Sequence, residues 1–257
     1  MWPMPEMTFH RQLLVGFLAA AIVTFPILFF VAAPYGRFIG KPWQGPTMDN
    51  RLAWMLMEMP AAVVFALTFY FGKYHSSQTS LFFLSLWQLH YIHRVFIYPI
   101  RLSGRNKRMP ILIAAFSFCF NVINAYLNGQ YLFTLSGGYP DSWLGDPRLL
   151  IGTGVFAAGY IINRQADHVL RKLRAAGESI YRVPRGGLFK WISSPNYLGE
   201  IVEWIGWAIA TWSMPGLVFA LWTMANLVPR ARATHRWYKA QFPEYPQERR
   251  ALLPGIW

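Results

Sequence analysis

The chain has 257 residues, of which 54% are hydrophobic and only 14% are charged, against roughly 25% charged in an ordinary soluble domain. The net charge is nevertheless +13, from 24 Lys and Arg residues against 11 Asp and Glu residues. This composition excludes a disordered chain and a soluble nucleic-acid-binding protein. The single cysteine, Cys119, excludes an intramolecular disulfide and a cysteine-based metal site. We therefore expect an all-α, polytopic integral membrane protein whose polar segments are basic.

Apolar segments long enough to cross a hydrocarbon core of roughly 30 Å recur along the chain. The first covers residues 13–33 and contains no charged residue. It is too long and too lightly flanked for a cleaved signal peptide, so we expect it to be retained. Four further spans are predicted over residues 53–72, 81–100, 111–135 and 149–163.

The last apolar stretch, residues 197–228, is too long for one ordinary span. At 1.5 Å per residue, a single helix of about 32 residues would measure about 48 Å. Pro215 and Gly216 lie near its middle and favour a break. The stretch is therefore either a hairpin of two short spans, over 197–213 and 215–229, or one tilted helix.

The distribution of basic residues favours the hairpin and hence about seven spans. With seven spans, the polar segments 34–52, 101–108, 164–195 and 230–257 fall on the same side of the membrane. They hold 3, 4, 7 and 6 Lys and Arg residues, which is 20 of the 24. Because basic residues concentrate in cytoplasmic segments, we expect this side to be cytoplasmic. We interpret residues 1–257 as a single membrane domain, in either a bacterial inner membrane or an endoplasmic reticulum.

Ionisable side chains inside the predicted spans are costly to bury, which is typical of functional residues. Glu58 lies among apolar neighbours, two residues before Pro60. A neutral carboxyl at this position could donate a hydrogen bond, and an ionised one could orient a tyrosine hydroxyl. The alternative interpretation is a glutamate near the end of a span that reaches interfacial water.

The third predicted span carries an unusual density of polar side chains. In a regular helix, Gln88, Tyr91 and Arg94 would share one face, and His90 would align with Arg94. Such a cluster indicates a cavity filled with water or ligand, whereas an interfacial belt would explain only part of it. His90 and His93 have no third ligand at a useful spacing, so we expect no metal site.

Three polar residues of the sixth predicted span share one helical face: Asn196, Glu200 and Glu203. Pro195 suits the first turn of a helix, with Ser193 or Ser194 as its N-cap. The free N–H groups of that turn and the Asn196 amide could bind a polar ligand. Alternatively, the two glutamates pair with arginines of the basic segments.

The basic segments 164–195 and 230–250 also contain several aromatic residues. They could attract anionic lipid, or they could hold a phosphate-bearing cofactor through arginine side chains. No strand-borne glycine motif indicates a Rossmann domain. Gly152, Gly154 and Gly159 lie inside a span and are better interpreted as close helix packing.

Five motifs resemble the steroid 5α-reductase family, the 3-oxo-5α-steroid 4-dehydrogenases. They follow one another in the chain at residues 89–94, 139–143, 178–189, 194–213 and 236–254. Together they cover nearly the whole chain after the first span. The resemblance implies seven spans, a hydrophobic substrate, and NADPH bound from the cytoplasmic side.

The resemblance also implies a reaction and a set of site residues. The Δ4 double bond of a 3-oxo steroid would be reduced by hydride transfer to C5, and a proton would reach C4 from solvent. Tyr91 would donate a hydrogen bond to the 3-keto oxygen with Glu58 as its partner, and Trp54 and Trp204 would line the steroid cavity. The implied cofactor-binding residues are Asn163, Asp167, Arg174, Tyr181, Asn196, Glu200, Tyr238, Arg94, Arg105 and Arg182.

Two other functional classes stay open at this point. A membrane methyltransferase of the isoprenylcysteine carboxyl type has a similar Pro-x-Tyr-x-Gly followed by Glu, but it leaves Glu58 and Tyr91 unexplained. A non-catalytic sterol- or lipid-binding membrane protein would keep the cavity, although the presence of Glu58, Tyr91 and Asn196 argues against it. The expected partners are a steroid and membrane lipid, without nucleic acid or metal, and we expect a monomer.

Overall fold

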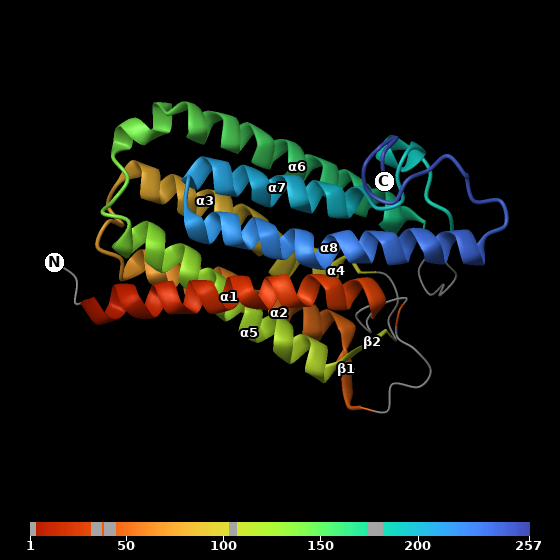
Figure 1. The fold of residues 1–257 in the computed structure, drawn as a ribbon, viewed down its shortest axis with the longest axis horizontal. Helices are drawn as coiled ribbons and strands as arrows, with labels where there is room; N and C mark the ends of the chain where they lie inside the picture. Colours follow the sequence, from red (N-terminus) through yellow and green to blue (C-terminus); the bar gives the residue numbers. More distant parts are fainter. Residues whose placement is uncertain (1–3, 32–37, 39–44, 103–106, 174–181) are drawn as a thin grey trace.

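The computed structural model describes residues 4–31, 38, 45–102, 107–173 and 182–257. Within these ranges, seven helices have 15 residues or more (Figure 1). They are α1 (Met4–Phe30), α2 (Asn50–Tyr70), α3 (Gln78–Ile92), α5 (Ile111–Gln130), α6 (Pro147–Lys172), α7 (Pro195–Thr211) and α8 (Met214–Gln241). The predicted all-α fold with about seven helices is therefore confirmed.

The shorter elements extend these helices or join them. π-helical turns continue α3 and α5, over His93–Ile97 and Tyr131–Leu135, and α4 (Tyr98–Ile100) follows the first of them. Single 3₁₀ turns cover Asp141–Gly145 and Gly187–Lys190. The strands β1 (Thr47–Asp49) and β2 (Arg108–Pro110) form an antiparallel pair.

The described parts of the four basic segments lie at one end of the helical bundle (Figure 1). Pairing of Met48 in β1 with Met109 in β2 joins the segment before α2 to the segment before α5. A bridge between Ile192 and Arg250 joins the segment before α7 to the C-terminal tail. Folding therefore brings together segments that the charge distribution assigned to one side of the membrane.

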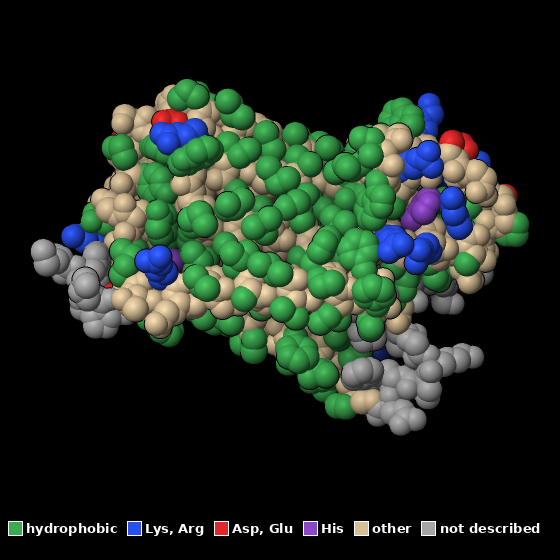
Figure 2. All heavy atoms as spheres, in the orientation of Figure 1, with side chains coloured by type: hydrophobic (Ala, Val, Ile, Leu, Met, Phe, Trp, Pro, Cys, Tyr) green, Lys and Arg blue, Asp and Glu red, His purple; other side chains and the backbone are tan. Residues whose placement is uncertain are grey.

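Among the described residues, three helical stretches are long and apolar enough to cross a membrane. They are Glu6–Phe30, Asn50–Tyr70 and Ile111–Leu135. Figure 2 shows hydrophobic side chains over the middle of the visible face, whereas Lys and Arg side chains lie towards its two ends. This distribution suits a protein that contacts lipid around its middle.

The last apolar stretch folds as two helices. α7 ends at Thr211, and Trp212 adopts a left-handed conformation with φ of 44°. Ser213 then caps α8, because its hydroxyl accepts a hydrogen bond from the Gly216 amide at 3.1 Å. Pro215 occupies the first turn of α8, where its missing N–H leaves no hydrogen bond unmade.

Helices α6 and α8 extend further at their C-terminal ends than the predicted spans. α6 runs to Lys172 rather than ending near residue 163, and α8 runs to Gln241 rather than 229. The start of the basic segment 164–195 is thus helical. Residues beyond the apolar part of α6 stay helical because they still pack in the protein: Asp167, for example, is buried.

The contact between α6 and α7 depends on glycines at a spacing of seven residues. A Cβ added at Gly152 would meet the backbone of Ala210 and Gly206, and one added at Gly159 would meet the backbone of Gly199 and Glu203. The backbones therefore touch over two helical turns, which confirms the sequence interpretation for Gly152 and Gly159. Gly154 is different, because a Cβ there would meet nothing within 4 Å.

An aromatic core lies beside this contact. Trp87 stacks on Phe65 with ring centroids 4.3 Å apart, and Trp204 lies 4.2 Å from Phe219. Buried indole N–H groups are satisfied across helices, since Trp87 donates to the Ala61 carbonyl at 2.8 Å. These contacts lock α2, α3, α7 and α8 together on one side of the site.

We expect Gly159→Ala to lower the melting temperature of the purified protein in detergent. The added methyl would press against the α7 backbone, and overpacking of this kind costs about 1–3 kcal/mol. Gly154→Ala is the matched control on the same helix; it adds the same methyl in open space and raises helix propensity. Equal melting temperatures for the two variants would contradict the close backbone contact.

Candidate active site

A cavity of about 790 Å³ lies among the helices, with walls from α2, the α3 end, α5, α6, α7 and α8. Ten of the residues predicted for the site line it: Trp54, Glu58, Tyr91, Arg94, Asn163, Asp167, Asn196, Glu200, Trp204 and Tyr238. Arg182 is described but lies outside the lining of this cavity. Arg105, Arg174 and Tyr181 fall outside the described residues.

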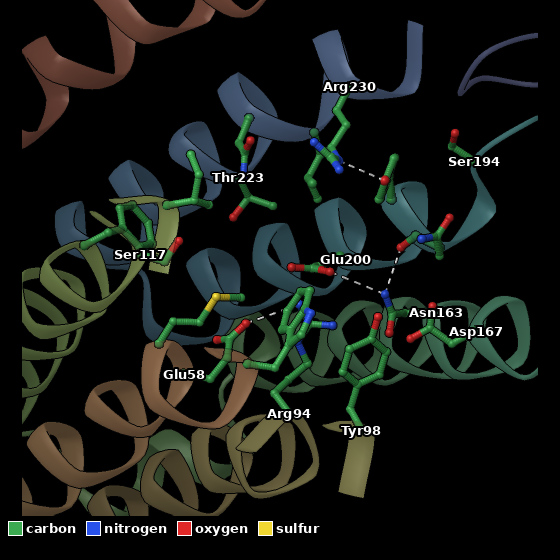
Figure 3. A pocket seen from close by; sticks show the side chains of 18 of the residues that line it. Glu58, Arg94, Tyr98, Ser117, Asn163, Asp167, Ser194, Glu200, Thr223 and Arg230 are labelled. Atoms are coloured by element: carbon green, nitrogen blue, oxygen red, sulfur yellow. Dashed lines mark hydrogen bonds and ion pairs between the residues drawn. The ribbon is translucent and has the colours of Figure 1, made fainter. Parts of the chain in front are cut away.

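Glu58 is held at one side of the cavity by two other helices. It comes from α2 and is 8% exposed. Arg94 donates from Nη2 to its Oε1 at 3.3 Å (Figure 3), and Asn121 of α5 donates from Nδ2 to its Oε2 at 3.5 Å. The Asn121 amide also donates to the Met57 carbonyl at 2.6 Å. Each carboxylate oxygen of Glu58 thus has its own partner.

Arg94 reaches Glu58 from a π-helical turn. The turn begins at His93, directly after α3, and π-helical turns are frequent at functional sites. The Arg94 guanidinium lies 4.7 Å from the Trp54 ring centroid and 4.9 Å from that of Tyr98, which are cation–π distances. Its charge is therefore balanced by one carboxylate and two aromatic faces.

The predicted stripe of Gln88, Tyr91 and Arg94 needs correction. Tyr91 and Arg94 do line the cavity, and so does His90. Gln88 points elsewhere, because its Nε2 donates to the Ala62 carbonyl of α2 at 2.8 Å. Arg94 follows the change from α- to π-helical winding at His93, so its position differs from that expected for a regular helix.

Tyr91 is buried among aromatic rings and faces the same cavity as Glu58. Its ring centroid lies 5.0 Å from that of Trp87 and 5.8 Å from that of Trp204. The hydrogen bonds described for Glu58 go to Arg94 and Asn121. A direct pair between Glu58 and Tyr91 therefore stays a prediction.

At the other side of the cavity, α6 and α7 present polar side chains to one another (Figure 3). Asn163 Nδ2 donates to the Asn196 carbonyl oxygen at 2.8 Å and to Glu200 Oε2 at 3.5 Å. Arg164 Nη2 donates to Asn163 Oδ1 at 2.5 Å and to Asp167 Oδ2 at 3.4 Å. These distances follow from the glycine contact one turn away, which brings the two backbones together.

Glu203 shares a face with Asn196 and Glu200 in sequence, yet it has a different partner. It is fully buried, and its Oε1 lies 2.7 Å from His90 Nδ1. The alternative interpretation, in which Glu203 pairs with an arginine of the basic segments, therefore does not hold. α7 packs against α3 at this level, so the nearest polar group is the His90 ring rather than a loop arginine.

The expected N-cap of α7 is also corrected. Ser194 occupies the N-cap position, but its hydroxyl makes no capping hydrogen bond. The Ser193 hydroxyl contacts His235 Nδ1 at 2.6 Å and the Tyr245 hydroxyl at 2.7 Å. Burial lowers the pKa of His235, and the nearby cationic side chains of Lys239 and Arg250 lower it further. The ring is therefore neutral near pH 7 and can accept a hydrogen bond from the Ser193 hydroxyl.

Several buried hydrogen-bonding groups on the cavity wall have no partner within the described part of the chain. They are Arg94 Nε, Arg171 Nη1, Ser194 Oγ and Thr234 Oγ1. Buried polar groups of this kind are normally hydrogen-bonded, and arginine N–H groups match the oxygens of a phosphate. The donor set therefore fits a phosphate-bearing ligand.

Sequence reasoning missed Asn121, although a signal was present. Asn121, Asn124 and Asn128 recur at a spacing of three and then four residues inside an apolar span, so they share one helical face. All three are buried. Amide side chains at membrane depth are expensive, like charged ones, and mark contacts between helices.

Comparisons with known proteins identify the family of the chain. The model of a family described as 3-oxo-5-alpha-steroid 4-dehydrogenase matches residues 107–257, which is more than half of the chain. The chain belongs to this family. The resemblance inferred from the motifs is confirmed, and so is the expectation of an oxidoreductase.

Individual relatives match almost from end to end. The chain is 40% identical to steroid 5-alpha-reductase DET2 of Arabidopsis thaliana, over 98% of each chain. It is 38% identical to 3-oxo-5-alpha-steroid 4-dehydrogenase 1 of Mus musculus, over 95% of this chain and 94% of the relative. For the Homo sapiens protein of the same name the identity is 40%, over 86% and 85%. Membership of this family favours the reductase over the methyltransferase and the non-catalytic binding protein.

We expect Asn121→Leu to lower the turnover of a 3-oxo steroid, because one oxygen of Glu58 would lose its partner. It would also lower the melting temperature, since the hydrogen bonds from the Asn121 amide to Glu58 and to the Met57 carbonyl would be lost, at about 0.5–1.5 kcal/mol each. Cys119→Leu is the control on the same helix, because Cys119 is exposed and lies outside the cavity wall. Equal turnover and melting temperature in both variants would contradict the role given to Asn121.

Proposed function

We propose that this protein reduces the Δ4 double bond of 3-oxo-Δ4 steroids to 5α-3-oxosteroids, with NADPH as the reductant. The observation that carries the proposal is the position of Glu58, Tyr91 and Arg94 on the wall of one cavity. This wall connects an aromatic part, with Trp54 and Trp204, to a part rich in arginine, asparagine and carboxylate side chains. A chain of this family therefore has a place for an apolar ring system beside a place for a charged cofactor.

The aromatic part suits the steroid. Trp54, Met57, Phe120, Trp204 and Phe219 line it and offer flat apolar surfaces. Burial of a rigid, apolar substrate against such surfaces supplies binding free energy without a large loss of conformational freedom. The ketone must then find a hydrogen-bond donor, and Tyr91, on the wall of the same cavity, is the donor that we propose.

Tyr91 would hold and polarise the 3-keto oxygen. As the double bond is reduced at C5, negative charge develops on that oxygen, and a donor fixed in advance stabilises it. Glu58, itself held by Arg94 and Asn121, would orient the Tyr91 hydroxyl through the predicted pair. Arg94 places a positive charge on the same wall. Protonation of C4 from solvent then completes the saturated ketone.

The polar part suits NADPH, which supplies a hydride when bound. Arg94, Arg171, Ser194 and Thr234 offer buried donors with no partner among the described residues. Asn163, Asp167, Asn196, Glu200 and Tyr238 line the same part and would orient the amide and sugar groups. Arg105, Arg174, Tyr181 and Arg182 complete the proposed set.

We also propose that the chain crosses the membrane several times, with the basic end in the cytoplasm. All four basic segments have described parts at one end of the bundle (Figure 1). Positive segments stay on the cytoplasmic side during insertion, and the cofactor is soluble in the cytoplasm. The steroid would then enter from the lipid side and NADPH from the aqueous side.

Purified protein should oxidise NADPH when progesterone or testosterone is added, and the steroid should gain two hydrogen atoms by mass. The absorbance of the reduced nicotinamide and the mass of the product are both followed. A reaction without steroid is the control. Binding of S-adenosylmethionine without steroid turnover would instead support the methyltransferase and contradict the proposal.

Tyr91→Phe and Asn196→Ala should affect different steps. Tyr91→Phe removes the donor to the ketone, so kcat should fall about 100-fold, the effect typical of losing one such donor, while NADPH affinity changes little. Asn196→Ala should mainly weaken NADPH binding. Steady-state kinetics and NADPH titration by fluorescence separate the two effects. The roles are wrong if both variants lose cofactor affinity to the same extent.

A further inference from the structure

We propose that His90 and Glu203 form a positioning pair that fixes Tyr91 and Trp204 for the reaction. The inference rests on the proposed reductase function and adds two residues to it. His90 precedes Tyr91 in the chain, and Glu203 precedes Trp204. A hydrogen bond between His90 and Glu203 therefore joins the neighbours of the proposed ketone donor and of the proposed steroid-lining indole.

The pair joins two helices at a buried point. Glu203 Oε1 of α7 lies 2.7 Å from His90 Nδ1 of α3, a short hydrogen bond. Glu203 is 0% exposed and His90 is 3% exposed. Because Nδ1 is engaged, the tautomer and the plane of the His90 ring are set by Glu203. The ring cannot rotate without breaking this bond.

The fixed ring in turn contacts both side chains of interest. The His90 ring centroid lies 4.9 Å from that of Tyr91, at an interplanar angle of 71°, and 4.7 Å from that of Trp204, at 63°. Both are edge-to-face arrangements, which favour one orientation of each ring. Trp204 also contacts Phe219 at 4.2 Å. A change in the tilt of His90 would therefore shift Tyr91 and Trp204 together.

Stability alone does not account for such a pair. A buried pair of ionisable groups is often no more stabilising than apolar side chains of the same volume, because both groups lose their hydration. Glu203 Oε2 even lacks a partner among the described residues. The surrounding core of α3 and α7 is aromatic and could accept Phe or Leu here. Apolar residues at these two positions could not supply a directional hydrogen bond, which is the feature that fixes the His90 ring.

Glu203→Leu and His90→Phe remove the hydrogen bond, whereas Glu203→Gln keeps an oxygen that can accept from His90. We expect the first two variants to lower kcat about 10–100-fold, as for a donor displaced by about 1 Å, with KM and NADPH affinity within about 3-fold of wild type. Glu203→Gln should recover kcat to within about 5-fold of wild type.

The double variant His90→Phe/Glu203→Leu is measured as well. Each single variant leaves one member of the pair buried without its partner, whereas the double variant removes both members. The double variant should therefore fold even if a single variant does not. If the two residues act as a unit, its kcat is no lower than that of the worse single variant. Gln88→Leu is the control: it removes another hydrogen bond from α3, to the Ala62 carbonyl, away from the cavity wall. Its kcat should stay within about 3-fold of wild type.

Three results would overturn the inference. They are a wild-type kcat in the double variant, a loss in Glu203→Gln as large as that in Glu203→Leu, and an equal loss in Gln88→Leu. Each of these results is informative only if the wild-type protein reduces the steroid. In that case the positioning role of the pair is wrong, but the proposed function still stands. A wild-type protein that reduces no steroid contradicts the proposed function, and the inference falls with it.

Discussion

The close backbone contact between α6 and α7 is the constraint on which the site depends. Gly152 and Gly159 on one helix face Gly199 and Gly206 on the other, and a Cβ at any of these positions would meet backbone atoms. Only glycines allow this approach. One turn beyond it, Asn163 reaches the Asn196 carbonyl and Glu200, so the polar wall of the cavity exists because the backbones touch.

The opposite wall follows another principle, in which one buried carboxylate is held by groups from separate helices. Glu58 has Arg94 on one oxygen and Asn121 on the other, and Arg94 lies between the rings of Trp54 and Tyr98. An uncompensated charge at this depth would be very costly, so the network must form as a unit. The same network leaves an aromatic surface open to the cavity, which suits the apolar rings of the proposed steroid substrate.

Local patterns in the sequence were enough to predict the helices and many of the site residues. They were not enough to predict the hydrogen-bond partners of those residues. Apolar length predicts the spans, and the family resemblance names Asn163 and Asn196, which line one cavity. The continuation of α6 to Lys172 depends on packing against distant residues, which no local pattern contains. The π-helical turn at His93 and the pairing of Glu203 with histidine rather than arginine depend in the same way on how neighbouring helices are oriented.

The central claim is that a cofactor hydride reaches C5 of a steroid whose ketone is polarised in this cavity. It is tested most directly with NADPH that carries deuterium at the transferable position of the nicotinamide, followed by mass spectrometry and NMR of the reduced steroid. We expect deuterium at C5 of a 5α product, with the new hydrogen at C4 coming from solvent. Deuterium at C4, or a reduced steroid without deuterium, would contradict it.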